Sequence, residues 1–333
     1  MSTRVLVRLL LLVAGLLVVG YLVRQIGPDV VWSALRSLSW RLLLVFLFPM
    51  CIVVVLDTVG WRFTFLRPPR SLTHLLAVRL AGEAVNLGTP TASVGGEPVK
   101  AYLLRPGVPL REGLASVIVD KTTTVAALVL FLALGLLVGA RLLPLSSPLM
   151  ITMAVLLGLE IVCVAGFVTV QLAGVLGVGG RLLRRFKLAP GRGQAMLEGM
   201  DQTLRALYLD HRSRLLVSGL FHLLAFGLGT FEIYVVVRLL DVPISLPAAL
   251  AIGAFGSAVK FFSFMIPASL GALEGGNVAI FSAFGLGGAV GLTYTLVRRL
   301  REIVWITVGF TLLSLLSARP AALVEPDLDD VQS

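Results

Sequence analysis

The segment from Leu72 to Leu104, LTHLLAVRLAGEAVNLGTPTASVGGEPVKAYLL, is rich in apolar residues but is interrupted by glycine, proline and charged residues. A second segment, from Leu246 to Leu286, is interrupted in the same way. Inside a membrane, irregular backbone is tolerated only where protein buries it or where it lines a wet cavity. Each segment is therefore predicted to form two short helices joined by a break near the membrane interior.

Composition places these segments in an integral membrane protein. The chain has 333 residues, of which 57% are hydrophobic and 14% are charged, whereas soluble domains carry about 25% charged residues. The net charge of +10 fits basic loops that face anionic lipid, so we expect membrane lipids and no nucleic acid as partners. Only two cysteines occur, which argues against a disulfide scaffold. Uninterrupted apolar runs long enough to cross a bilayer lie at residues 5–23, 42–61, 114–139, 149–172, 215–237 and 288–317.

The predicted fold is all-α: a polytopic helical membrane protein with about six full spans and two re-entrant broken-helix hairpins. We expect a single integral membrane domain over residues 1–318 and a disordered acidic tail over 319–333. Residues 194–211 place apolar side chains at helical spacing, which predicts an amphipathic helix on the inner membrane surface. A helix that packs on the bundle is the alternative.

The two broken segments are predicted to belong to an inverted repeat. The densest basic stretch, residues 181–214, is expected in the cytoplasm, and counting spans from it places both termini there and opens the hairpins on opposite sides. Residues 90–97 and 267–274 each run from proline through serine, an aliphatic residue and glycine to an acid. Oppositely oriented broken segments are typical of inverted-repeat transporters with a site near the midplane. The repeats would cover about residues 42–139 and 214–317, unless the match arose by chance.

Charged residues inside these apolar segments are candidates for a function. An ionisable side chain at the bilayer centre costs about 2.5 to 3.5 kcal/mol on insertion scales. Glu97 and Glu274 follow the breaks and are expected in the first turn of a half-helix, where they either cap the helix or help to form a site. Exposed backbone N–H groups at the breaks, with cations beside them, favour an anionic headgroup. The cations expected there are Arg79, Lys100, Lys260 and Arg298.

Other buried charges need partners from other helices. Asp120 is followed directly by Lys121, and sequence neighbours on a helix do not face each other. We predict that Asp120 pairs with an arginine of the 298–301 cluster, either as a structural ion pair or within the site. Glu160 and Glu232 are lone acids in apolar runs, and each is either a proton-coupling carboxylate or a structural partner of a neighbouring helix.

No motif for catalysis or cofactor binding is found in the sequence. The histidines His74, His211 and His222 lack metal-ligand spacing, so we expect no metal site. No nucleophile elbow, phosphate-binding loop or dinucleotide fingerprint occurs either. We therefore expect no cofactor and no catalytic residue.

The broken segments resemble the signature of the lysylphosphatidylglycerol synthase transmembrane, or flippase-like, family. The similarity covers nearly the whole chain, and within the family it looks closest to the branch associated with hopanoid biosynthesis. One departure is Ser269-Leu270, which stands where glycines are expected and stiffens the second break. The matching stretches are Arg79 to Arg105 with Gly82-Glu83, Asn86, Pro90 and Gly95-Gly96-Glu97, then Ala115 to Lys121, Leu204 to Tyr208, Ile266-Pro267, Gly271, Glu274-Gly275-Gly276 and Leu296 to Glu302.

The resemblance implies a bacterial inner-membrane protein that moves a lipid, or helps to move it, between leaflets or onward to another membrane. Bifunctional family members carry a soluble aminoacyl-transferase domain after the membrane part. Here the chain ends about 16 residues after its last span, so we expect no enzyme activity. The alternatives are a membrane-embedded lipid-modifying transferase and a scaffold, with a homo-oligomer or lipid-synthesis enzymes as protein partners. The predicted headgroup site comprises Arg79, Glu83, Asn86, Gly95, Gly96, Glu97, Lys100, Asp120, Lys260, Glu274, Gly275, Gly276, Arg298 and Arg301.

Overall fold

A computed structural model describes Arg24, Asp29 and residues 47–89, 95–105, 107–174, 191–264, 266, 269 and 271–318. Within these ranges every regular element is a helix, so the all-α prediction is confirmed for the described residues. The predicted span at 5–23 and the predicted tail at 319–333 lie outside the described ranges. The helices are α4 (Met50–Arg62), α5 (Leu72–Gly88), α6 (Gly96–Leu103), α7 (Leu110–Gly139), α8 (Pro148–Ala173), α10 (Gly191–Asp210), α11 (Arg212–Leu239), α12 (Leu246–Phe262), α13 (Ala272–Ala283) and α14 (Gly288–Ser317).

Four helices are long and apolar enough to cross a membrane: α7, α8, α11 and α14, with 30, 26, 28 and 30 residues. At 1.5 Å per residue each exceeds the roughly 30 Å of a hydrocarbon core. They coincide with the runs predicted at 114–139, 149–172, 215–237 and 288–317, which are confirmed as candidate spans. Only 11% of the apolar window of α8 is buried by protein, so lipid must solvate most of this helix.

Helix α4 is shorter than the run predicted at 42–61. It begins at Met50, after Pro49 at the N-cap, and has 13 residues. Proline has no N–H group with which to continue a helix upstream, so it marks the start of α4. A helix of this length spans about 20 Å, less than the hydrocarbon core. Residues 42–46 lie outside the described ranges, and the described part of the run is not a full span.

Both broken segments consist of two helices with a break between them, as predicted. In the first, α5 ends at Gly88 and α6 begins at Gly96. In the second, α12 ends at Phe262 and α13 begins at Ala272, after Gly271 with φ of +79°. Glycine adopts this left-handed backbone without the penalty that a Cβ would impose. Parts of both breaks, including residues 90–94, lie outside the described ranges.

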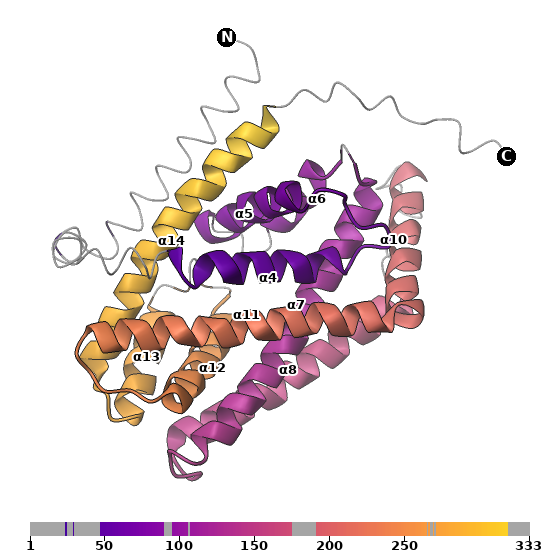
Figure 1. Ribbon diagram of the computed structural model, residues 1–333. Coiled ribbons are helices and arrows are strands. Elements are labelled where there is room, and N and C mark those ends of the chain that lie inside the picture. The colour runs from indigo at the N-terminus through magenta and orange to yellow at the C-terminus, as the bar shows by residue number, and fades with distance from the viewer. Residues whose placement is uncertain are drawn as a thin grey trace.

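The helices pack in a crossed arrangement, which Figure 1 allows the reader to follow. Helix α5 of the first broken pair packs along α14, and α12 of the second packs along α7. The short helices contact the next helix in the chain, α6 against α7 and α13 against α14, while α4 lies along α11. One hydrophobic core lies around Phe131, Phe255 and Phe281, and a second around Trp61, Phe65 and Phe310.

Helix α10 covers the predicted amphipathic segment 194–211 and packs on the bundle. Leu204 and Leu207 are fully buried against Ala115 and Val119 of α7. The Tyr208 hydroxyl donates to Gln171 of α8 over 2.9 Å, and burial raises the pKa of this phenol. Apolar contacts and a buried hydrogen bond therefore fix α10 across the ends of α7 and α8.

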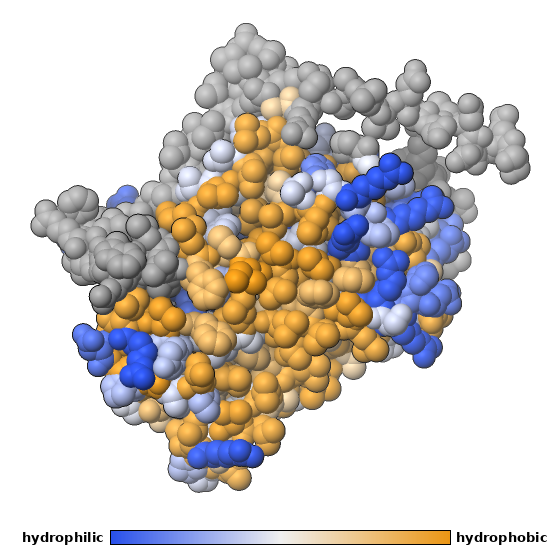
Figure 2. All heavy atoms as spheres, in the orientation of Figure 1, coloured by the Kyte–Doolittle hydropathy of each residue, from blue (hydrophilic) through white to orange (hydrophobic). Residues whose placement is uncertain are grey.

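The outer surface has the polarity of a membrane protein. Figure 2 shows a broad apolar face, with hydrophilic residues gathered mainly along one margin, where α10 lies. The end of α4, the start of α7 and the start of α11 meet at one end of the bundle, because Arg67 N donates to Glu112 and the Arg214 guanidinium donates to the Leu66 carbonyl. This basic end of the bundle comprises Arg62, Arg67, Arg70, Arg105, Arg111, Arg205, Arg212 and Arg214.

Candidate functional site

A buried cluster of four charged or titratable side chains links α4, α5, α7 and α11. The Arg79 guanidinium lies 3.2 Å from the Asp120 carboxylate and 3.7 Å from that of Asp57. Its Nη1 also donates to the Asp57 carbonyl over 3.2 Å. The His222 ring lies between the same two acids, with Nδ1 2.7 Å from Asp57 and Nε2 3.0 Å from Asp120. The cluster thus holds four helices together through ionic hydrogen bonds.

A second cluster surrounds the break between α5 and α6. Lys100 lies 2.5 Å from Glu83 and 3.2 Å from Glu97, and Lys121 of α7 lies 2.9 Å from Glu97. The Lys100 side chain is 1% exposed and its ammonium lies 5.9 Å from the ring centroid of Trp61. Glu83 and Lys121 are 36% and 40% exposed, so this cluster is open at one side.

Asn86 holds the first break together. Its side-chain amide donates to Glu97 over 2.9 Å, and its carbonyl oxygen accepts from the backbone N–H of Gly96 over 2.7 Å. A Cβ on Gly96 would overlap the carbonyl group of Gly82, so only glycine allows the two backbones to approach this closely.

The corresponding cluster at the second break is built on α12, α13 and α14. Glu274 accepts a hydrogen bond from the Gly271 N–H over 2.7 Å and pairs with Arg299 at 2.9 Å. The same carboxylate therefore caps α13 and forms an ion pair with α14. Arg299 also lies 3.0 Å from Glu302, and Lys260 lies 3.5 Å from the same carboxylate. Glu97 and Glu274 both stand in the first turn of a half-helix, as predicted.

Two further arginines of α14 complete this cluster. Arg298 lies 3.5 Å from Glu302, one turn further along the helix, and interacts with the Tyr294 hydroxyl. Arg301 pairs with Glu232 of α11, so Glu232 has a partner on a neighbouring helix. Glu160 of α8 is fully buried, and among the described residues neither of its carboxylate oxygens has a hydrogen-bond partner.

The charged side chains described above form two networks. The N-terminal network surrounds the first helix break, and the C-terminal network surrounds the second. Among the described residues, the N-terminal network has three cations, four carboxylates and a histidine, and the C-terminal network has four cations and three carboxylates. They consist of Asp57, Arg79, Glu83, Glu97, Lys100, Asp120, Lys121 and His222, and of Glu232, Lys260, Glu274, Arg298, Arg299, Arg301 and Glu302, respectively.

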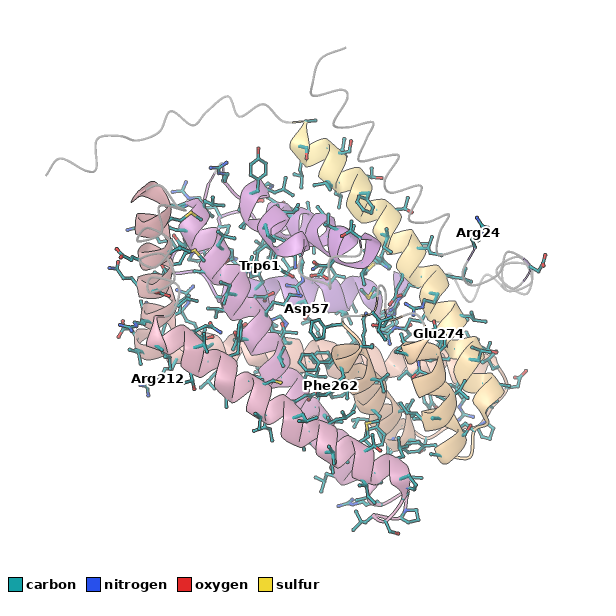
Figure 3. The ribbon with its side chains drawn as sticks, turned by 180° about the vertical axis from the view of Figure 1, so that it is seen from behind. Arg24, Asp57, Trp61, Arg212, Phe262 and Glu274 are labelled. Carbon is teal, nitrogen blue, oxygen red and sulfur yellow. The ribbon has the colours of Figure 1, made fainter. Side chains whose placement is uncertain are left out.

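A long-range electrostatic interaction links the two networks. Lys260 of the C-terminal network interacts electrostatically with Glu83 of the N-terminal network. The Lys260 side chain is 39% exposed, which is similar to the exposure of the Glu83 and Lys121 side chains. Figure 3 shows Asp57 and Phe262 near the centre of the bundle and Glu274 beside α14, whereas Arg212 lies at the periphery, where α10 meets α11.

One prediction about the site is wrong. Asp120 was expected to pair with an arginine between 298 and 301, but it pairs with Arg79 and His222, because α7 packs against α11 and α12 while α5 lies along α14. At Gly275 a Cβ would meet no atom within 4 Å. At Gly276, by contrast, a Cβ would lie 2.7 Å from Val259, so this glycine is needed for packing.

The site includes residues that the predicted set left out. Asp57 and His222 are each a lone polar residue in an apolar stretch, and that isolation was the only sequence signal for them. Lys121 and Arg299 stand beside predicted residues and make the contacts with Glu97 and Glu274. Glu302 accepts from several cations and is the centre of the C-terminal network.

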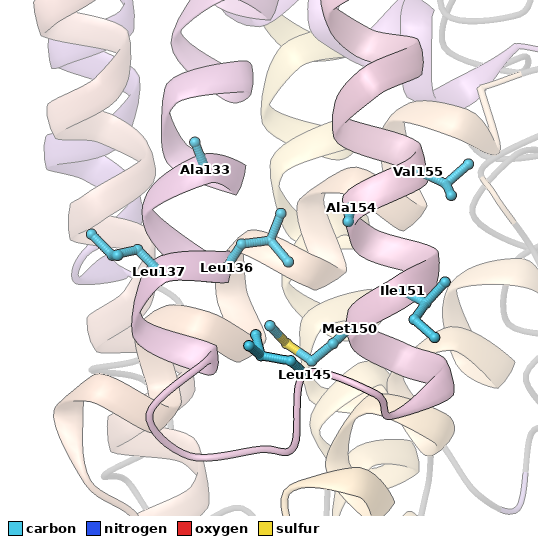
Figure 4. A pocket seen from close by; sticks show the side chains of 8 residues that line it. All are labelled: Ala133, Leu136, Leu137, Leu145, Met150, Ile151, Ala154 and Val155. Carbon is cyan, nitrogen blue, oxygen red and sulfur yellow. The ribbon is translucent and has the colours of Figure 1, made fainter.

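A separate groove of about 700 Å³ opens between α7 and α8. Figure 4 shows its wall, which carries no charged side chain among the residues that line it. Such a wall suits hydrocarbon rather than a headgroup, so the groove is distinct in chemistry from the two networks. It is lined by Ala133, Leu136, Leu137, Leu145, Met150, Ile151, Ala154 and Val155.

Comparisons with known proteins place this architecture in a family. The family model described as the lysylphosphatidylglycerol synthase TM region matches residues 5–309. A UPF0104 membrane protein of Methanothermobacter thermautotrophicus is 26% identical over 313 residues, which cover 87% of this chain and 90% of that protein. No solved structure matches the chain. Since the matched region includes both broken segments, three of the long helices and most of α14, the chain belongs to the lysylphosphatidylglycerol synthase transmembrane-region family.

Proposed function

We propose that the protein is a lipid translocase, or a lipid-transport factor, that binds a polar or anionic headgroup between the two helix breaks. The observation that carries the proposal is the set of partly exposed charged side chains, Glu83, Lys121 and Lys260, that belong to the ion-pair networks beside the two helix breaks. Charged groups inside a membrane are costly and tend to mark the path of a polar substrate. Lipid tails remain in the bilayer while the headgroup passes along these charges.

The charge of the C-terminal network favours an anionic headgroup at that network. The C-terminal network has one more cation than carboxylates among the described residues, and Lys260 is its most exposed cation. A phosphate that approaches Lys260 gains a charge-assisted hydrogen bond and neutralises the excess charge. Lys260 and Arg298 are both already paired with Glu302. A bound anion would therefore compete with the Glu302 carboxylate for these two cations.

We further propose that the broken pairs are re-entrant and belong to an inverted repeat. Leu75 at the start of α5 and Leu103 at the end of α6 share one core with Trp61 at the end of α4, which supports entry and exit on one side. In the proposed repeats, α5 corresponds to α12 and α7 corresponds to α14. Helix α5 packs on α14 and α12 packs on α7, so each broken pair contacts the long helix of the other half. This correspondence is expected if the repeats run from residues 42–139 and 214–317.

For orientation, we propose a bacterial cytoplasmic membrane with the basic end of the bundle and both termini on the inner side. Cytoplasmic loops carry an excess of lysine and arginine in membrane proteins. The other end of the bundle carries Arg141 and Arg238, with Asp241 close to Arg238 in the chain. The basic end would lie against anionic lipid headgroups, which also supports α10 as a surface helix.

Reconstitution into liposomes tests the translocase. Vesicles would contain a lipid labelled on its acyl chain, and a membrane-impermeant quencher would report the rate at which the label changes leaflet. Phosphatidylglycerol and phosphatidylcholine with the same acyl chains separate anionic from zwitterionic headgroups, and a hopanoid with a polar side chain tests the branch that the sequence resembles. We expect phosphatidylglycerol to exchange faster with the protein than without it.

Variants connect the exchange to the networks. Lys260→Gln removes the ion pair with Glu302, and Glu97→Gln removes the ion pairs with Lys100 and Lys121; for each variant we expect a loss of at least about ten-fold in rate. Arg141→Gln is the matched control, because Arg141 is an exposed cation away from both networks. If no lipid exchanges faster than in protein-free vesicles, the proposal fails. If lipid extracts from cells with and without the gene differ by a new modified species, the transferase replaces it.

A further inference from the structure

We propose that His222 binds an exchangeable proton between Asp57 and Asp120, and that binding and release of this proton are coupled to lipid movement. The proton at His222 is a property of the buried site alone, whereas its coupling to lipid movement rests on the proposed translocase function. The ligand of the site is H⁺, and the proton gradient across the membrane would supply the driving force.

The geometry at His222 requires more than one proton. The ring is fully buried, with Nδ1 2.7 Å from Asp57 and Nε2 3.0 Å from Asp120. A neutral imidazole carries one N–H group, so one of these contacts would set a nitrogen lone pair against a carboxylate oxygen. Both contacts are hydrogen bonds only if a second proton is present. Because carboxyl groups are stronger acids than imidazolium, the second proton belongs on the ring.

The surrounding charges agree with this proton count. The groups that face the triad are Asp57 from α4, Asp120 from α7 and Arg79 from α5, and Lys100 from α6 acts on Asp120 at longer range. Two carboxylates against the single Arg79 guanidinium leave one negative charge in a buried cluster. An imidazolium at His222 removes that imbalance, which a low-dielectric interior would otherwise penalise.

Asp57 provides the route for proton exchange. Its side chain is 25% exposed, whereas Asp120 is 4% exposed and His222 is fully buried. In the release step the Nδ1–H bond breaks and an O–H bond forms on Asp57, which then gives the proton to water. The Nε2–H group keeps its hydrogen bond to Asp120. The balance is one proton transferred from His222 to solvent, with no other reactant.

Release of the proton weakens the contact between α4 and α11. The Nδ1 lone pair then faces the Asp57 carboxylate at the position of the former hydrogen bond, and the two repel. The ring also packs directly on α4, because a Cβ on Gly60 would lie 3.1 Å from it. Helices α4 and α11 lie along each other, so the occupancy of this site biases their packing. A transporter needs such a bias to exchange one conformation for another.

Nuclear magnetic resonance tests the protonation state without any transport. The full chain would be labelled with ¹⁵N at histidine and placed in lipid nanodiscs, with His74→Gln and His211→Gln removing the other two histidines. We expect both ring nitrogens of His222 to be protonated at neutral pH. In Asp57→Asn the ring loses one carboxylate, and the imidazolium signal should decrease. A neutral imidazole at pH 7 in the unsubstituted triad overturns the proposal.

Lipid accumulation tests the coupling. Vesicles would carry a pH difference of one unit, with the membrane potential held at zero by valinomycin and equal potassium on both sides. If one proton moves with each lipid, the labelled lipid should reach a leaflet ratio shifted by up to about ten-fold. His222→Gln should abolish the shift. His211→Gln, a histidine at the N-cap of the same helix, is the matched control and should keep it.

The outcomes separate the two proposals. Lipid exchange that ignores the pH difference overturns the coupling and leaves the translocase standing. A full shift in His222→Gln also overturns it, since the proton would then bind elsewhere. If the wild-type protein moves no lipid, the proposed function fails, and the resonance experiment alone decides whether His222 holds a second proton.

Discussion

The backbone of Gly96 in α6 lies directly against the backbone of Gly82 in α5, with no room for a Cβ between them. This contact closes the first broken pair, and the Asn86 side chain bonds to the Gly96 N–H beside it. The two helices therefore meet across their backbones rather than through interdigitated side chains. Any added atom at Gly96 must push α6 away from α5.

Gly96→Ala should destabilise the protein. Overpacking in a well-packed core costs about 1 to 3 kcal/mol, and we expect the upper part of this range because the obstacle is backbone. Gly275→Ala is the matched control, since it makes the same change near the start of α13 at the second break and its Cβ would meet no atom within 4 Å. The midpoint of detergent-induced unfolding, followed by helicity, measures both. Equal midpoints for the two variants would contradict the close contact.

Loss of either partner of the Glu232–Arg301 pair should destabilise the bundle more than loss of both. Breaking a buried ion pair leaves one charge without a partner and costs about 3 to 5 kcal/mol, whereas replacing both partners with apolar residues is often neutral. In the same unfolding assay, we expect Glu232→Leu and Arg301→Met each to lower stability strongly, and the double variant to lower it only slightly. Arg238→Met, at an exposed position of α11, should change stability by less than about 0.5 kcal/mol. Additive effects of the two single changes would refute the pairing.

Tyr208→Phe should loosen α10. The Tyr208 hydroxyl donates to Gln171, whose amide in turn donates to Thr122 over 3.1 Å, so one change leaves a buried acceptor without its partner. The expected cost is about 1 kcal/mol. Proteolysis of α10 in the membrane-bound protein provides a local measurement. Tyr234→Phe, where the hydroxyl only accepts a 3.4 Å bond from Arg238, should be cleaved at the wild-type rate.

Glu160→Leu should stabilise α8. The Glu160 carboxyl group is fully buried, and within the described ranges neither oxygen has a hydrogen-bond partner. Burying an unsatisfied polar group costs about 1 to 3 kcal/mol, and leucine removes that cost. The unfolding midpoint should rise, and lipid exchange should continue. A lower midpoint together with lost exchange would assign Glu160 to the transport pathway instead.

Long uninterrupted helices were predictable because their signal is local. The bounds of α8 and α14 follow from apolar runs flanked by polar residues, and hydrophobicity alone decides such segments in lipid. The breaks were equally visible, because glycine and proline interrupt the hydrogen-bonded backbone wherever they occur. The start of α4 also has a local signal, because Pro49 lies inside the predicted run and α4 begins directly after it, at Met50.

The pairing of charges was not predictable from one sequence. Asp120 was assigned to the arginines of α14, but its partners are Arg79 and His222, because pairing depends on which helices are neighbours in space. Helical spacing determines which side chains share a face of one helix and leaves the facing helix undetermined. The cap role of Glu274 was predictable, since it depends only on the four residues that begin α13.

The crossed packing of α5 on α14 and of α12 on α7 means that the molecule has no internal seam. Each broken pair packs against a long helix from the other half of the chain, so the two halves share one packing interface and are not separate units. If the chain were cut between Gly174 and Gly191, neither fragment would keep the surface that its partner covers. The two pieces would have to be synthesised together and assemble as a pair, and a gene encoding one half would yield a stable product only as an intertwined dimer.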